Sequence, residues 1–198
     1  MVKIGKYVTI FIVKEIQMRY NERRENLKEL GSNTKERKTG NRIATTFFPI
    51  TKKDATKLRG WDFNWIKPFK SRNCKVVALC TAKNKTEYQG LIAYEERPKD
   101  YSVKVLLVES NPHNIGRNGI YEGAGGHLFA IAIKKSYELG FEGHIYFISK
   151  TNKMAYYQNT FGARIINAKT RTMVIDADAS KKLYETYILG MEEKENDV

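Results

Sequence analysis

Short apolar runs separated by polar links follow one another through the middle of the chain, a pattern typical of β-strands. Three such runs follow one another closely, at residues 75–82, 89–95 and 101–110, with short polar links between them. Links of this length join neighbouring antiparallel strands, whereas parallel strands need a longer crossover. We therefore expect the three runs to form an antiparallel meander.

After residue 126 the apolar pattern becomes helical. The pattern then predicts, in order, a helix, a strand, a second helix and a final hairpin, at residues 127–139, 143–149, 151–161, 164–167 and 171–176. Gly140 and Gly162 stand where the two helices should end. This order of elements predicts an α/β protein of the α+β type, with a mixed, mostly antiparallel central sheet flanked by helices.

The first part of the chain is less regular. Residues 7–16 and 42–50 have the composition of strands, and residues 19–30 suggest a short helix that leads into a charged, mobile segment reaching residue 42. An aromatic cluster follows, and its side chains favour a core or a cleft wall over a platform for nucleic-acid bases. The cluster consists of Trp61, Phe63 and Trp65. With 198 residues, the chain is long enough for one domain with its own core and short for two.

Positive charge is concentrated in the first half of the chain, which carries most of the net charge of +13. Residues 1–75 contain 19 Lys and Arg against 7 Asp and Glu, whereas residues 76–198 contain 16 against 15. Clustered Lys and Arg attract phosphate-bearing partners through counterion release. The same excess can also serve only to keep the protein soluble, so both interpretations stay open.

Cysteine usage and hydropathy narrow the expected compartment. Cys74 and Cys80 form no CxxC pair and have no neighbouring histidine, so neither a disulfide framework nor a zinc site is expected. No apolar run approaches the ~20 residues of a membrane span. Charges interrupt residues 1–17, unlike the apolar segment of a signal peptide. We therefore expect a cytoplasmic protein with no membrane association and no metal.

A glycine cluster stands between the meander and the first predicted helix, where Gly123, Gly125 and Gly126 follow a loop at 111–122. Glycines permit tight turns whose N–H groups point inward, and a helix N-terminus adds about half a positive charge. This combination suits a pyrophosphate, although glycines before a helix also occur in plain turns. A dinucleotide-binding fold needs parallel βαβ units, and a Walker loop needs Lys-Ser/Thr after the glycines; the sequence has neither.

Residues 75–166 resemble the acetyl-CoA core of the GNAT acyltransferase superfamily. The signature of that family is Gln/Arg-x-x-Gly-x-Gly/Ala, and residues 120–125 match both glycines while Ile120 replaces the usual Gln or Arg. Other positions match in the same order along the chain, namely Pro112, Asn152, Ala155, Tyr157 and Gly162. The loop after Pro112 is enlarged, and Tyr157 and Gly162 lie one residue further apart than in the commonest form.

The resemblance implies a single domain over residues 1–198. Residues 1–74 would shape the acceptor side, residues 75–176 would bind acetyl-CoA, and residues 191–198 would form a polar tail. The implied reaction moves an acetyl group from acetyl-CoA directly to a primary amine in a ternary complex. Backbone amides would hold the pyrophosphate, and the end of the third meander strand would pair with the pantetheine. The residues implied to bind the coenzyme are Val108, Ser110, Gly123, Ala124, Gly125, Gly126, His127, Leu128 and Asn152.

The implied reaction needs two proton transfers. An ammonium of pKa about 10 must lose a proton, and a thiolate whose conjugate acid has a pKa of about 8.5 must gain one. Tyr157 is the implied acid, with Tyr156 as its alternative, and Glu109 is the first candidate for the base. A purely structural role for Glu109 also stays open. The alternatives for the base are a water relay and the side chains of Lys104, Glu95, Glu96 and His113.

Two other classes of function remain open. The replacement at Ile120 favours an acetyl-CoA-binding module without turnover, and the basic first half favours a protein that binds nucleic acid or the ribosome. If the chain is an enzyme, a positive surface repels a free polyamine. We therefore expect an amine acceptor that is anionic or attached to nucleic acid or to an acidic protein. A homodimer is compatible with all of these hypotheses.

Overall fold

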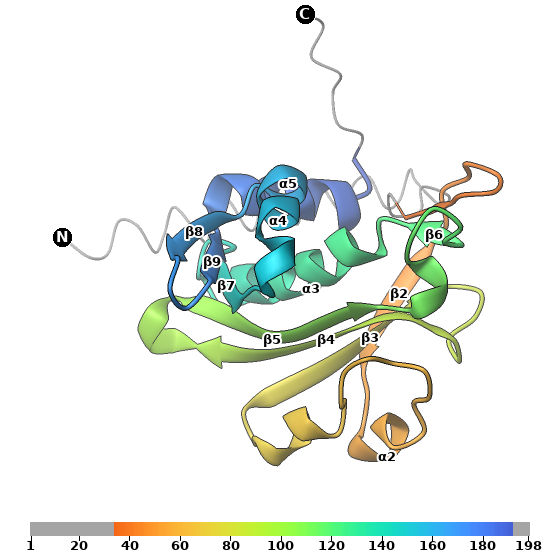
Figure 1. Ribbon diagram of the computed structural model, residues 1–198, viewed down its shortest axis with the longest axis horizontal. Coiled ribbons are helices and arrows are strands. Elements are labelled where there is room, and N and C mark those ends of the chain that lie inside the picture. The colour runs from red at the N-terminus through yellow and green to blue at the C-terminus, as the bar shows by residue number, and fades with distance from the viewer. Residues whose placement is uncertain (1–33, 192–198) are drawn as a thin grey trace, which may run out of the picture.

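The computed structural model describes residues 34–191, and within them a seven-stranded sheet forms the centre of the protein (Figure 1). In spatial order the strands are β2 (Thr45–Pro49), β3 (Cys74–Thr81), β4 (Tyr88–Arg97), β5 (Ser102–Ser110), β7 (Ile145–Ile148), β9 (Thr172–Ile175) and β8 (Arg164–Asn167). Every neighbouring pair is antiparallel except β5 and β7, which are parallel. The predicted mixed, mostly antiparallel sheet is confirmed.

Three helices cover one face of this sheet (Figure 1). They are α3 (Ala124–Glu138), α4 (Met154–Phe161) and α5 (Ala177–Tyr187). The core between helices and sheet includes Ile92, Val105, Leu128, Phe129 and Met173, none more than 3% exposed. Burial of a side chain of this size stabilises a fold by about 1.5–3 kcal/mol, so this layer fixes α3 against the sheet.

The opposite face of β3 and β4 is covered by the segment that joins β2 to β3. This segment contains α2 (Lys52–Ala55) and a 3₁₀ turn, η1 (Lys67–Lys70). Its main anchor is Trp65, which is 2% exposed and belongs to a second core with Val76 and Leu91. The structure therefore confirms the prediction that the aromatic cluster belongs to a core or a wall.

The meander strands match their predicted limits closely, whereas the helices differ from theirs. The first helix begins at Ala124 because Gly123, with φ 87°, turns the chain directly into it. The second predicted helix divides into a 3₁₀ turn, η4 (Thr151–Lys153), and α4. The sequence did not predict α5, whose first turn is capped by the Asp176 carboxylate, which accepts a hydrogen bond from the Ala179 N–H at 3.1 Å.

A small second sheet joins the start of the described chain to the loop before α3. In it, β1 (Lys35–Glu36) pairs with β6 (Tyr121–Glu122), where the sequence had favoured a mobile loop through residue 42. The Arg37 N–H also donates to the Ile120 carbonyl at 2.9 Å. The strand predicted at 7–16, the helix at 19–30 and the tail after residue 191 lie outside the described residues.

Candidate functional site

The strands β5 and β7 are paired over only part of their length. Their paired residues end at Val105 and Phe147, although β5 continues to Ser110. The register between β4 and β5 shifts just beyond Val105, which makes Leu106 an extra residue in β5. Such a bulge bends a strand and increases its twist. The last residues of β5 therefore diverge from β7. The stretch beyond Val105 and Phe147, where the two strands are not paired, is called the opening.

The N-terminus of α3 comes next in the chain after β5 and the loop that contains β6. The N–H groups of Ala124, Gly125 and Gly126 have no partner within the helix, because the first turn of any α-helix lacks acceptors for them. The His127 N–H donates to the Gly123 carbonyl at 3.0 Å. Helix geometry places the Leu128 amide one step deeper. The amides free for an anion are thus fewer than the sequence suggested, because those of His127 and Leu128 belong to the helix.

The neighbouring glycines of this helix turn face different surroundings. A Cβ atom built on Gly125 would lie 3.7 Å from Ser110 Oγ, 3.9 Å from Phe161 Cζ and 4.0 Å from the Tyr156 hydroxyl. Gly125 therefore lies beside the end of β5 and beside α4, with room for a methyl group. A Cβ on Gly126 would lie 2.6 Å from Tyr187 Cζ, inside the ring's van der Waals surface. Gly126 serves the packing of α3 against α5.

The side chain of His127 is also structural. Its ring is 2% exposed, and its Nδ1 lies 3.3 Å from Thr34 Oγ1 and 3.4 Å from Thr45 Oγ1. Burial lowers the pKa of the imidazole to about 3. The ring is therefore neutral at physiological pH and offers no positive charge to a phosphate.

The loop between β5 and α3 is held against β4 by one buried amide. Asn114, in the 3₁₀ turn η3 (Pro112–Asn114), donates from Nδ2 to the Gln89 carbonyl at 3.1 Å. Its Oδ1 accepts from the Tyr121 N–H at 3.1 Å. These bonds fix the approach to α3 in spite of the enlarged loop. His113, a candidate base, is exposed in the same turn.

Two tyrosines of α4 occupy different parts of the opening. The ring of Tyr157 packs edge-on against Phe147, at 5.0 Å between centroids, and against Phe129 at 5.8 Å. Phe147 is the last residue of β7 that pairs with β5, so Tyr157 lies where the strands part. Tyr156 instead directs its hydroxyl toward Gly125. Burial raises the pKa of both phenols, with a smaller contribution to Tyr157 from Tyr156, so both are protonated at neutral pH.

The carboxylate of Glu109 faces away from α4 and is fully engaged. It accepts hydrogen bonds from the Asp62 N–H at 2.6 Å, the Phe63 N–H at 3.2 Å and the Trp65 Nε1–H at 2.8 Å. The residue is 8% exposed. These contacts give Glu109 a structural task that the sequence had only left open, while its role as a base stays a prediction.

Three alternative bases lie in the paired half of the sheet. Glu95 stands opposite Lys104 across β4 and β5, and Lys104 stands opposite Tyr146 on β7. Both positions precede the point where the strands part. Glu96 forms an ion pair with Lys135 at 3.4 Å. None of these three contacts brings a carboxylate or amine into the opening.

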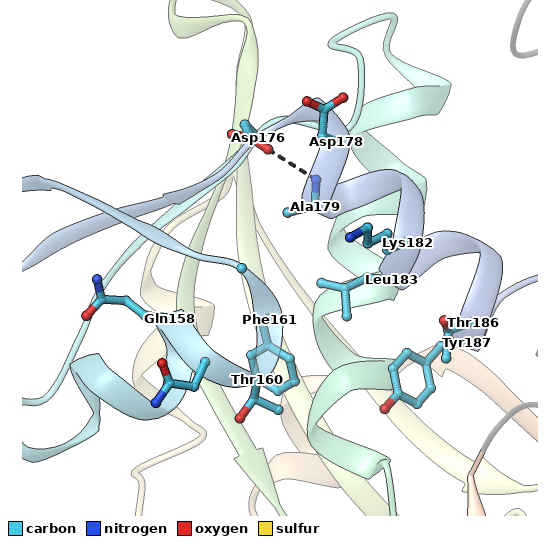
Figure 2. A pocket seen from close by; sticks show the side chains of 12 residues that line it. Gln158, Thr160, Phe161, Asp176, Asp178, Ala179, Lys182, Leu183, Thr186 and Tyr187 are labelled. Carbon is cyan, nitrogen blue, oxygen red and sulfur yellow. Dashed lines mark hydrogen bonds between the residues drawn. The ribbon is translucent and has the colours of Figure 1, made fainter. Parts of the chain in front are cut away.

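A cavity of about 470 Å³ lies between α4 and α5 (Figure 2). Figure 2 shows Phe161 on one side and Tyr187 on the other, the two rings that approach Gly125 and Gly126. Its polar lining is mixed in charge, since Lys182 lies near Asp176 and Asp178. The sequence could not indicate this cavity because it did not predict α5. The cavity is not lined by Asn152, which lies in η4.

Comparisons with known proteins identify the fold. No family model matches the chain, and no curated protein matches its sequence. Solved structures do match: AtaTR bound with acetyl-CoA, at 12% identity and a TM-score of 0.50, covers 71% of this chain and 98% of its own. The AtaT–AtaR complex with DNA has 12% identity and a TM-score of 0.51, covering 70% and 99%.

A third match, the KacTA–DNA complex, has 12% identity and a TM-score of 0.50, and it covers 71% of this chain and 98% of its own. At such identities the likeness concerns the fold alone. The protein has the fold of the GNAT acetyltransferases, which confirms the fold that the sequence predicted. Within residues 34–191, no helix is long and apolar enough to cross a membrane.

Proposed function

We propose that the protein is an acetyl-CoA-dependent N-acetyltransferase that acts on a primary amine. The observation that carries this proposal is the opening between β5 and β7, with the free amides of α3 at one end and Tyr157 at the other. A long, bent thioester coenzyme with an anionic end fits such a site better than a compact ligand does. The fold supports acetyl transfer in general.

The coenzyme would bind through main-chain groups. The amides of Ala124, Gly125 and Gly126 at the start of α3 suit a pyrophosphate, because they combine unpaired donors with the positive end of the helix dipole. The diverging edge of β5 offers main-chain groups at Val108 and Ser110 to the amides of pantetheine. One matching structure is described as bound with acetyl-CoA.

Four other residues are proposed to support the coenzyme site. Gly123 would provide the turn that aims the amides, and Asn152 would act from η4, the link between β7 and α4. His127 and Leu128 would contribute by fixing α3, through a buried ring and a fully buried side chain, rather than through their amides.

The chain's role in the reaction follows from this placement. The neutral amine nitrogen forms a bond to the thioester carbonyl carbon, and the bond from carbon to sulfur breaks. Tyr157 gives its phenolic proton to the leaving thiolate, and the proton of the attacking nitrogen passes to a base or to water. Holding the two reactants together supplies much of the rate, since oriented reactants reach effective molarities of ~10⁵ M or more.

The acceptor is proposed to be anionic or attached to an anionic carrier. Lys52, Lys53 and Lys57 are exposed in and beside α2, on the face of the sheet opposite α3. A phosphate-bearing acceptor would approach this face while the coenzyme occupies the other. Two of the matching structures, the AtaT–AtaR and KacTA complexes, contain DNA. A cytoplasmic location and a homodimer stay predictions of the sequence.

One alternative has a specific observation in its favour. Ile120, at the position where the family signature has Gln or Arg, is 45% exposed and offers no side-chain donor to a phosphate. An acetyl-CoA-binding module without turnover would tolerate this loss. Thiol release from acetyl-CoA with a panel of primary amines separates the enzyme from the binding module, because the module would bind acetyl-CoA and release no thiol.

The proposed coenzyme site is tested by a matched pair of variants. Gly125→Asp places a negative charge beside the α3 amides and should abolish acetyl-CoA binding in calorimetry. Gly125→Ala adds only a methyl group with ordinary contacts of 3.7–4.0 Å, and it should fold and bind nearly as wild type. Equal affinities for wild type and Gly125→Asp would rule out this site.

A further inference from the structure

Glu109 lies at the end of β5, the strand whose main chain is proposed to bind the coenzyme, and its side chain points to the other face of the sheet. Its neighbours Val108 and Ser110 lie on the diverging part of β5. Side chains alternate along a strand, so Glu109 points to the opposite face from Val108, which packs against the core under α3. The partner of Glu109 across β4 is Leu91, a member of the second core.

On that face the carboxylate organises the aromatic loop, residues 61–66. It accepts two backbone N–H groups and one indole N–H, at 2.6–3.2 Å. Hydrogen bonds to an ionised carboxylate are roughly twice as strong as those between neutral groups. Three of the about four lone-pair positions of the carboxylate are occupied in this way. The loop therefore depends on a residue that is more than 40 positions away in the sequence.

One outer ring of the loop, that of Phe63, contacts the chain just after β7. Trp61 and Phe63 pack edge-on against the buried Trp65, with centroids 6.3 and 6.5 Å apart. The Lys150 ammonium lies 4.5 Å above the Phe63 ring, and Lys150 follows the end of β7. The aromatic loop thus connects the ends of the two diverging strands, on the face opposite α3 and α4.

We propose that Glu109 is a positioning residue that holds the aromatic loop as the acceptor-side wall of the opening, and that it does not take the proton of the amine. This inference rests on the proposed function. Since both carboxylate oxygens already face the loop, a substrate amine could reach them only after the loop had moved. The wall presents the partly exposed rings of Trp61 and Phe63 to the acceptor.

The chain contains its own reporter, because both of its tryptophans lie in the aromatic loop. Glu109→Gln keeps the size of the side chain but places an amide NH₂ among N–H donors, and Glu109→Ala leaves all three donors without their acceptor. Both variants should shift tryptophan emission to longer wavelength and raise its quenching by acrylamide. The matched control is Glu95→Gln, which changes another buried carboxylate, bonded instead to Ser71 at 3.0 Å and to Arg97. It should leave the tryptophan signals unchanged.

A second variant guards against loss of the fold. Trp65→Phe keeps an aromatic ring and removes one of the three donors to Glu109. Trp61 is then the remaining tryptophan, and its quenching by acrylamide should increase less than in the Glu109 variants. Circular dichroism should show the same secondary structure in all variants. Unchanged emission and quenching in both Glu109 variants, with the fold intact, would overturn the proposal.

Kinetics separate positioning from proton transfer, using acetyl-CoA and a primary amine that the wild type acetylates. A displaced wall should raise the KM for the amine and lower the rate by up to ~10²-fold, while the pH–rate profile and the affinity for acetyl-CoA stay as in wild type. Loss of the alkaline-rising limb in Glu109→Gln, with tryptophan signals unchanged, would make Glu109 the base instead. If the wild type acetylates no amine, the proposed function fails, and the tryptophan signals still decide whether Glu109 holds the loop.

Discussion

The contact between Gly126 and Tyr187 allows a quantitative prediction about the helix that begins the coenzyme site. Gly126→Ala would place a Cβ 2.6 Å from Tyr187 Cζ, so the ring and α5 must move. Overpacking of this kind costs about 1–3 kcal/mol. Alanine is a better helix former than glycine by about 1 kcal/mol, which offsets part of the cost. We expect a net loss of up to about 2 kcal/mol, or a Tm lower by up to about 8 °C.

The matched control is the preceding residue of the same helix. Gly125→Ala gains the same helix propensity without a clash, because its nearest neighbours would be at 3.7–4.0 Å. Its stability should therefore equal or exceed that of the wild type. Urea denaturation followed by far-UV circular dichroism measures both variants under the same conditions, and equal m-values confirm that the unfolded states are comparable.

A double variant identifies the cause. Tyr187→Ala removes the ring, so the further addition of Gly126→Ala should then cost nothing, and the interaction energy between the two substitutions should exceed the error of about 0.5 kcal/mol found for independent sites. If Gly126→Ala is as stable as Gly125→Ala, or if the loss persists in the Tyr187→Ala background, the assignment of Gly126 to helix packing is wrong.

Three more predictions concern the proposed chemistry and the buried histidine. Tyr157→Phe should lower turnover by ~10²–10⁴-fold with little change in acetyl-CoA affinity, and Tyr156→Phe should mainly lower the affinity for acetyl-CoA. Steady-state kinetics and calorimetry measure both effects, and the reverse result would exchange the roles of the two tyrosines. Charge reversal on the basic surface around α2 should raise the KM for a phosphate-bearing acceptor and make this KM less dependent on salt, while the KM for acetyl-CoA stays unchanged. If the wild-type kinetics do not depend on salt, the surface serves only solubility. The residues to reverse are Lys52, Lys53 and Lys57. Because burial lowers the pKa of His127 to about 3, the unfolded chain binds a proton first as pH falls below about 6.5. Stability should therefore decrease by about 1.5 kcal/mol between pH 6.5 and 5. His127→Phe should remove that part of the decrease in urea midpoints, and an unchanged pH dependence would contradict the role of His127.

The sequence predicted the parts of the fold that depend on local patterns. The meander strands are short apolar runs bounded by turn residues, and the actual limits of β3 and β4 differ from the predicted ones by only one or two residues. The helix that became α3 was predicted three residues too late, because its first residues are glycines. The order of elements predicted the mixed, mostly antiparallel sheet, and the motif residues carried the resemblance to the GNAT fold. Local periodicity and turn residues involve only a few neighbouring positions, so they can be recognised in the sequence without knowledge of the tertiary structure.

Helix α5 escaped prediction because its apolar face is narrow. Only Leu183, Tyr184 and Tyr187 supply large buried or half-buried rings and chains along its length, and its cap, Asp176, also closes the preceding strand. The roles of Gly126 and Glu109 were equally hidden. Each depends on a partner far away in the sequence, Tyr187 in one case and the aromatic loop in the other. A sequence pattern does not reveal such contacts.

The diverging end of β5 has a consequence for the protein without coenzyme. From Leu107 to Ser110 this strand has an edge that β7 does not pair with, although it lies inside the sheet. Open edges recruit other strands and promote aggregation. If pantetheine lies along it, the coenzyme acts as a missing strand, and it stabilises the folded state by about 2.7 kcal/mol at a hundred times its Kd. The supply of coenzyme in its surroundings would then set how long the protein stays folded and soluble, in addition to how fast it works.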